Sequence, residues 1–139
     1  MKKLSLLALT LCLTVLCFAQ DKGKPVMVFT EKTYDFGTVK EEAGKITHEF
    51  TFKNTGDAPL VIPQVTASCG CTTPSWTKEP IAPGATGTIT VTYNASGRPG
   101  PFTKTITVVN NSAETPQILK ITGTVTPKAA TTAQTTVQK

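Results

Sequence analysis

The sequence predicts an all-β protein, an immunoglobulin-like β-sandwich of about seven antiparallel strands preceded by a cleaved signal peptide. Apolar and polar residues alternate along several short segments, as is typical of strands with one buried face. Threonine occurs 27 times in the 139 residues, and ten glycines and ten prolines supply turns. No segment shows a convincing helical period, and a small barrel is the alternative architecture.

The first residues carry the pattern of a secretory signal peptide. Two lysines precede an almost wholly apolar run at residues 4–19, and a polar segment begins at Gln20. The run is shorter than the ~20 residues of a membrane-spanning helix. We therefore expect cleavage after Ala19, removal of residues 1–19, and a secreted or periplasmic protein with no membrane span in its mature chain.

A lipid anchor is the alternative outcome for this leader. Cys12 and Cys17 lie within it, but each follows a leucine, whereas bacterial lipidation signals have a small residue before the cysteine. Cleavage after Ala19 would discard both cysteines, so we expect a mature chain without lipid.

Seven segments of the remaining chain are predicted to be strands: residues 26–30, 33–39, 45–54, 60–68, 86–93, 102–109 and 118–125. Gly37 inside the second segment predicts a bend or bulge. The third alternates over its whole length, with Ile46, His48, Phe50 and Phe52 on one face. We expect this face to be buried.

Turn signals separate the later strands. An Asn-Thr-Gly-Asp turn at residues 54–57 precedes the fourth strand, and Pro63 inside that strand predicts an edge position. A Pro- and Gly-containing loop at residues 80–84 precedes the fifth strand, in which threonines alternate with mostly apolar residues. The sixth strand ends in an Asn-Asn-Ser turn at residues 110–112, and the seventh strand completes the set.

The β-sandwich domain is expected to span residues 26–126. No cysteine pair is spaced to bridge two sheets, so the domain lacks the disulfide of antibody domains. Residues 127–139 are rich in Thr, Ala and Gln and poor in large apolar side chains. We expect this segment to be a disordered tail.

Charge and motifs argue against several classes of function. The 14 basic and 9 acidic residues give a net charge of +5, and without the two leader lysines the balance is 12 against 9, or +3. This is too thinly spread for the basic patch of a nucleic-acid-binding protein. The sequence contains no G-x-S-x-G, H-E-x-x-H or phosphate-binding glycine loop. We predict a protein that is not an enzyme.

Cys69 and Cys71, separated by Gly70, are the residues with the clearest chemical potential. A disulfide within the mature chain must join these two. On a regular strand they would lie too far apart to bond, but Gly70 allows a tight turn. The small ring would add only about 1.6 kcal/mol of stability before strain. A local disulfide with structural or redox consequences is therefore the first interpretation.

Two other interpretations of the cysteines stay open. Two thiolates suit Cu(I), and with His48, the only histidine, the obvious metal ligands number three. Copper is the cofactor that this set suggests. His48 is also explained as a strand residue at the start of an inward-facing row. The pair can equally be two inert, partly buried thiols.

Trp76 and Arg98 are candidates for contact with a partner. Trp76 is the only tryptophan and either fills the core or anchors a partner at the surface. Arg98 lies in a loop with two glycines and two prolines, where it can recognise a carboxylate or bond a nearby carbonyl.

Six short motifs point to a family. They are Tyr-Asp-Phe-Gly-Thr-Val at 34–39, Phe-Lys-Asn-Thr-Gly at 52–56, Ser-Cys-Gly-Cys-Thr at 68–72, Ile-Ala-Pro-Gly at 81–84, Gly-Arg-Pro-Gly-Pro-Phe at 97–102 and Ile-Thr-Gly at 121–123. Together they resemble the secreted bacterial family called domain of unknown function 1573, over about residues 28–126. The resemblance implies an Ig-like sandwich related to periplasmic chaperone and major sperm protein domains. It implies no reaction.

Two functions follow as hypotheses. The first is a non-catalytic binding or structural module outside the cytoplasm, whose strand edges an unknown protein or peptide of the cell envelope can extend. The alternative is a thiol-redox or copper-binding protein that acts through Cys69 and Cys71. A hydrolase that uses His48 ranks third.

Overall fold

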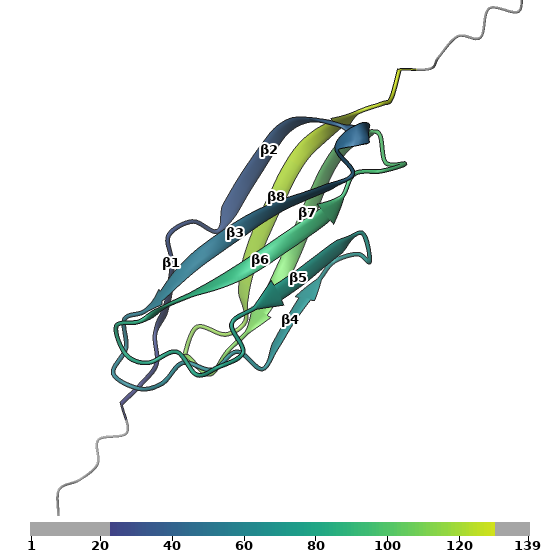
Figure 1. The fold of residues 1–139 in the computed structure, drawn as a ribbon. Coiled ribbons are helices and arrows are strands. Elements are labelled where there is room, and N and C mark those ends of the chain that lie inside the picture. The colour runs from purple at the N-terminus through teal and green to yellow at the C-terminus, as the bar shows by residue number, and fades with distance from the viewer. Residues whose placement is uncertain (1–22, 130–139) are drawn as a thin grey trace, which may run out of the picture.

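Two four-stranded sheets pack face to face in this protein, and this confirms the predicted β-sandwich (Figure 1). The structure is a computed structural model that describes residues 23–129. The predicted signal peptide and residues 130–139 of the predicted tail lie outside the described residues. Among the residues described, no helix has the length and apolar character needed to cross a membrane.

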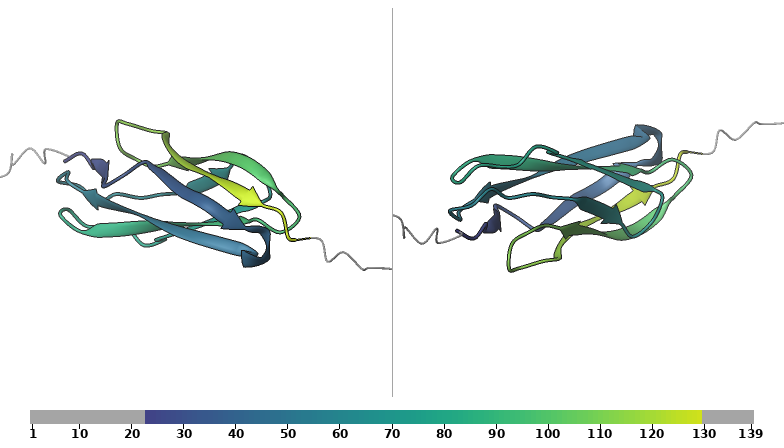
Figure 2. Two further views of the ribbon diagram at one scale, coloured as in Figure 1. Left: turned by 90° about the horizontal axis from the view of Figure 1, so that it is seen from above. Right: turned by 90° about the horizontal axis from the view of Figure 1, so that it is seen from below.

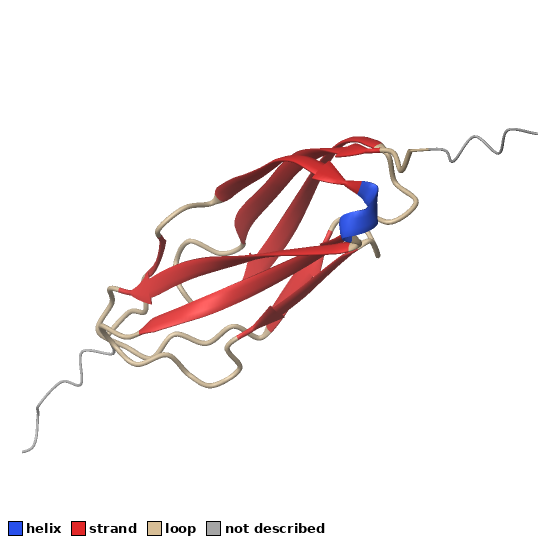
Figure 3. Ribbon diagram, turned by 45° about the horizontal axis from the view of Figure 1, so that its top comes forward, coloured by secondary structure: helices blue, strands red, loops and turns tan. Residues whose placement is uncertain are grey.

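Each of the two sheets combines strands from distant parts of the chain. The first sheet has the order β1 (Met27–Phe29), β3 (Lys45–Asn54), β6 (Thr86–Asn94), β5 (Thr72–Trp76). The second has the order β2 (Thr33–Lys40), β8 (Gln117–Thr126), β7 (Gly100–Val109), β4 (Gln64–Ala67). Figure 2 shows the two layers from above and below, and Figure 3 shows the helical turn η1 (Glu41–Ala43) between β2 and β3.

The N-terminal strand of an Ig-like sandwich is divided here into two strands, β1 in the first sheet and β2 in the second. β1 pairs antiparallel with β3, and after residues 30–32 the chain crosses over, so that β2 pairs parallel with β8. The remaining order is that of an immunoglobulin constant domain, in which the first strand joins one sheet. The expected antiparallel set therefore contains one parallel pair, because the chain changes sheets without reversing direction.

The core lies between the sheets where the alternating strands predicted it. Phe50 and Phe52 of β3 and Ile89 and Val91 of β6 are fully buried, and the threonines that alternate with the buried residues of β6 face outward. Burying an apolar side chain of this size contributes about 1.5–3 kcal/mol. The alternation in the sequence therefore correctly predicts which faces hold the sheets together.

The predicted bulge lies in β2. The register with β8 shifts between Asp35 and Thr38, and Gly37 has a φ of 64°. The Gly37 N–H donates to Asp35 Oδ1 at 2.9 Å. Glycine suits this position because side chains disfavour the left-handed region.

The fourth predicted strand is shorter than expected. β4 begins at Gln64, directly after Pro63, and Leu60 instead forms an isolated bridge with Ile81. Proline has no N–H for a ladder, so regular pairing starts only beyond it. β4 nevertheless lies at the edge of its sheet, as Pro63 predicted.

A buried asparagine ties several turns to the end of β3. Asn54 is fully buried, and its Nδ2 group donates to the carbonyl oxygens of Ala58 at 2.8 Å and Ile81 at 2.9 Å. Its Oδ1 atom accepts N–H bonds from Gly56 at 3.1 Å and Val26 at 3.3 Å. One side chain thus satisfies backbone groups from the N-terminal segment and two separate loops.

Candidate functional site

Cys69 and Cys71 lie in the turn that carries the chain from β4 in the second sheet to β5 in the first. Their Cα atoms are 5.3 Å apart and their sulfurs are at disulfide distance. The Thr72 N–H donates to the Cys69 carbonyl at 3.2 Å, which closes the turn. Both cysteines are half-buried, so the pair is accessible from solvent.

Gly70 makes this turn without the special backbone conformation of glycine. Its φ lies outside the left-handed region, and no atom lies within 4 Å of the place that a Cβ would take. The sequence correctly predicted a tight turn at Gly70. A larger residue would also fit there, so the steric reason for glycine that we expected does not apply.

A buried hydroxyl group lies against both sulfurs. Thr72 is only 4% exposed, and its Oγ1 atom is 3.7 Å from Cys69 Sγ and 3.9 Å from Cys71 Sγ. Sequence reasoning missed this residue, although Thr72 belongs to the Ser-Cys-Gly-Cys-Thr motif. Adjacency to the cysteines was the available signal, but the direction of its side chain was not predictable from it.

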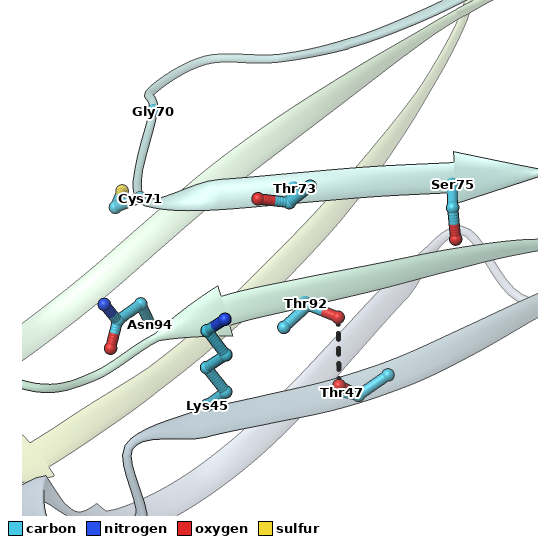
Figure 4. A pocket seen from close by; sticks show the side chains of 8 residues that line it. All are labelled: Lys45, Thr47, Gly70, Cys71, Thr73, Ser75, Thr92 and Asn94. Carbon is cyan, nitrogen blue, oxygen red and sulfur yellow. Dashed lines mark hydrogen bonds between the residues drawn. The ribbon is translucent and has the colours of Figure 1, made fainter.

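A polar depression of about 570 Å³ lies beside the turn, on the outer face of the first sheet (Figure 4). Its lining comes from β3, β5, β6 and the turn: Lys45, Thr47, Gly70, Cys71, Thr73, Ser75, Thr92 and Asn94.

Strand pairing brings these residues together. Lys45 pairs with Asn94 across β3 and β6, and the Asn94 N–H donates to the Cys71 carbonyl at 2.9 Å. The hydroxyl groups of Thr47 and Thr92 bond to each other at 3.0 Å. Lys45 is the one charged residue of the lining, and its side chain extends from β3 toward β6 (Figure 4). The depression therefore offers hydroxyl and amide groups beside a single positive charge.

His48 does not join the cysteines. Its Nε2 atom lies 2.8 Å from Glu31 Oε1, and its ring stacks on Tyr34 with centroids 3.5 Å apart. Within residues 23–129, no three His, Cys, Asp or Glu side chains are grouped so that they could hold a metal ion. The candidate metal set of His48, Cys69 and Cys71 is thus not brought together, and His48 instead links β3 to β2 of the other sheet.

Trp76 and Arg98 both have partners within the chain. Trp76 is half-buried, its Nε1–H donates to the Ile62 carbonyl at 2.9 Å, and Lys78 Nζ lies 3.0 Å from the centroid of its ring. It therefore links β5 to the segment before β4 and packs against the core, while contact with a partner stays a prediction. Arg98 Nη1 donates to the Ser96 carbonyl at 3.1 Å and holds its own loop.

The family model described as protein of unknown function (DUF1573) matches residues 27–125. The chain belongs to this family. The match covers both sheets and the cysteine turn, and it confirms the family resemblance of the sequence motifs. A comparison with curated proteins finds no match for the DUF1573 chain.

Solved structures share the fold. A protein of unknown function from Porphyromonas gingivalis W83 is similar with a TM-score of 0.62 and 16% identity, over 72% of this chain and 46% of that one. The ASH/PapD-like domain 7 of human CEP192 is similar with a TM-score of 0.61 and 8% identity, over 76% of this chain and 88% of that domain.

A third similar structure is an enzyme. The secreted serine protease VesC from Vibrio cholerae has a TM-score of 0.55 and 16% identity, over 71% of the DUF1573 chain and 23% of the protease. The DUF1573 chain therefore spans about half the length of the Porphyromonas protein and about a quarter of VesC. At these identities the likeness shows the Ig-like fold alone.

Proposed function

We propose that this protein is a secreted or periplasmic, non-catalytic Ig-like module that binds a protein or peptide of the cell envelope. The leader sequence supports export with cleavage after Ala19. The observation that supports binding most directly is the polar depression beside the cysteine turn, because it is concave and carries a single positive charge. The contacts of His48 with Glu31 and Tyr34 support a structural rather than a catalytic role for this side chain.

Docking on the face of the first sheet is better supported than addition of a strand at an edge. β1 has three residues and β4 has four, β5 contains Pro74, and the bulge at Gly37 interrupts β2. Short strands, prolines and bulges are the devices by which β proteins prevent pairing at their edges. The edges that first suggested a peptide partner are therefore poor sites for one.

A photo-crosslinking amino acid tests this docking face. The amino acid replaces Thr92 in the full chain, and the protein is expressed in a bacterium, where envelope proteins are present. We expect one defined crosslinked adduct, and Lys45→Glu should weaken it. Thr103, on the outer face of the second sheet, is the matched control position and should give none. Equal labelling from both positions would contradict docking on the first sheet.

A thiol-redox or copper-binding protein is the second candidate, and the geometry of the cysteine turn favours it. The two sulfurs are at disulfide distance, both cysteines are half-buried, and Cys71 lines the depression. After reduction the same two thiolates are ligands that Cu(I) accepts.

Intact mass spectrometry of protein from the envelope fraction tests export and the disulfide together. We expect a chain that begins at Gln20, is two hydrogens lighter than the dithiol, and accepts alkylating reagent at two sites only after reduction. A retained leader would contradict cleavage after Ala19, and a lipid-sized increase would establish the anchor instead. Two alkylatable thiols without reduction would remove the disulfide and direct the work to Cu(I) titration.

A further inference from the structure

The hydroxyl group of Thr72 has poor hydrogen-bond acceptors when the cysteines are bonded. It is buried, and among the described residues its hydrogen-bond partners are the two sulfurs, at 3.7 and 3.9 Å. Sulfur in a disulfide is a weak acceptor, whereas a thiolate is charged and accepts strongly. The same hydroxyl therefore binds more strongly once the disulfide opens, and it favours the opened state.

The two sulfurs differ in the approach that they offer to a reagent. Cys71 lines the depression and Cys69 does not. A thiolate attacks a disulfide sulfur and displaces the other sulfur of the pair. A thiol that enters through the depression therefore meets Cys71 first, and Cys69 becomes the leaving group.

Lys45 places a positive charge beside the cysteine turn. It is the charged residue of the lining, and it stands two strands away from Cys71, at a backbone distance of about 10 Å. The side chain of Lys45 extends toward β6, the strand that lies between β3 and the cysteine turn (Figure 4). At low salt such a charge attracts an anionic thiol and repels a cationic one.

We propose, resting on the redox candidate above, that the cysteine turn reacts with anionic thiols in one direction: the thiol attacks Cys71 from the Lys45 depression, and the Thr72 hydroxyl stabilises the departing Cys69 thiolate. Thr72 is a positioning and stabilising residue in this reaction, and Cys71 is the electrophile. The substrate class is a thiol that carries a carboxylate or another anionic group, such as a cysteine in an acidic peptide segment.

The exchange transfers two electrons from two substrate thiols to the protein disulfide. The entering thiolate forms a bond to Cys71 Sγ, and the electron pair of the Cys69–Cys71 bond moves to Cys69 Sγ, which takes up a proton. A second thiolate then attacks the substrate sulfur of the mixed disulfide and releases Cys71 as a thiolate, which is also protonated. Two substrate thiols are oxidised to one disulfide, and the protein disulfide is reduced to two thiols.

Thr72→Val tests the role of the hydroxyl, because it replaces the hydroxyl with a methyl group of similar size. We expect reduction of the full-length oxidised protein by 2-mercaptoethanesulfonate to slow about ten-fold, as for the loss of a hydrogen bond to a charged group. Thr72→Ser should restore the rate, and Thr66→Val, at an exposed threonine of β4 outside the depression, should not change it. In the reduced Thr72→Val protein, the midpoint of the pH profile for alkylation of Cys69 should move upward.

Lys45→Glu tests the charge preference. Wild-type protein should react about three-fold faster with 2-mercaptoethanesulfonate than with cysteamine at low salt, relative to the rates of both thiols with a small-molecule disulfide. Lys45→Glu should reverse this order, and 0.5 M salt should remove it. Lys120→Glu, an exposed change of the same charge in the other sheet, is the matched control.

The outcomes separate this inference from the redox candidate. A wild-type protein that lacks the disulfide, or whose disulfide resists all these thiols, overturns the redox candidate itself. Normal exchange with the same rate and pH profile in Thr72→Val overturns the role of Thr72 alone. Fragment-ion mass spectrometry of the trapped mixed disulfide should place the probe on Cys71, and a probe on Cys69 would overturn the direction of attack.

Discussion

Replacing Asn54 with aspartate is expected to lower the free energy of unfolding by about 4 kcal/mol at pH 7. The amide donates to the carbonyl oxygens of Ala58 and Ile81 from a fully buried position. A carboxylate turns an oxygen atom toward both carbonyls, so two attractions become repulsions and a charge is buried. Domains of this size have a total stability of about 5–15 kcal/mol, so the loss is a large part of it.

Urea unfolding at several pH values distinguishes this cause from a simple loss of packing. Burial is expected to raise the pKa of the introduced carboxyl above its ordinary value of about 3.9 in the folded state. A group whose folded pKa is raised stabilises the fold below its unfolded pKa, and that contribution is lost as the pH rises through the folded pKa. The difference between variant and wild type should therefore shrink toward pH 4, which also allows the comparison if the variant is unfolded at pH 7.

Asn111→Asp is the matched control. Asn111 also accepts from one backbone N–H, that of Val61 at 2.8 Å, and donates to one carbonyl, that of Pro59 at 3.1 Å, but it is exposed. Water screens the same exchange there, and we expect a loss below about 1 kcal/mol. Equal losses for the two variants, or a loss from Asn54→Asp that does not depend on pH, would contradict this account.

The strands that were predictable from the sequence are those with one buried and one exposed face. β3 and β6 alternate over nearly their whole length, and their inward residues are the core of the first sheet. β5 was not predicted, because Thr-Thr-Pro-Ser-Trp has polar residues on both faces and a proline at its centre. An edge strand has one neighbour and little burial, so its sequence carries little of the pattern that identifies strands.

The division of the first strand was predictable only in part. The sequence separated residues 26–30 from 33–39, and the structure has β1 and β2 there. The partners of these strands lie far along the chain, and β2 joins β8 in parallel. Local periodicity predicts which residues are buried, but it does not predict which strand lies beside them. The change of sheet between β1 and β2 was therefore not predictable.

The candidate site was predictable at its centre and not at its borders. Cys69 and Cys71 stood out because of their type and spacing, and the structure brings their sulfurs to disulfide distance. Lys45 is distant in sequence and reaches the depression only through the pairing of β3 with β6. Thr72 is adjacent to Cys71, but its role depends on where one hydroxyl points, which spacing does not report.

Replacing Gly87 with alanine is expected to cost about 3 kcal/mol of stability, the second large effect in this protein. Gly87 of β6 pairs with Phe52 of β3, and the Phe52 ring lies over it. A Cβ at Gly87 would lie 2.9 and 3.0 Å from the two Cε atoms of that ring and closer still to its Cζ atom. Phe52 is fully buried and packs edge-on against Phe29, so the ring has no free space into which to move.

The second sheet repeats this arrangement, and its repetition explains why glycine occurs inside two otherwise regular strands. Gly123 of β8 pairs with Phe102 of β7, and a Cβ at Gly123 would lie 2.8 Å from the ring. In each sheet an aromatic ring thus fills the volume that a side chain of its cross-strand neighbour would occupy. Gly87→Ala and Gly123→Ala should therefore both lower the midpoint of urea unfolding, without a change of slope.

Gly70→Ala is the control that separates steric conflict from a general effect of adding a methyl group. Gly70 lies in the cysteine turn with no atom within 4 Å of the Cβ position and a φ outside the left-handed region. We expect a change within about 0.5 kcal/mol, or a slight gain, because alanine restricts the unfolded chain more than glycine does. If Gly87→Ala is as mild as Gly70→Ala, the Phe52 ring can move and the core at β3 and β6 is looser than its burial indicates. A severe loss at Gly70 would instead show that the cysteine turn needs glycine for a conformation other than the one described.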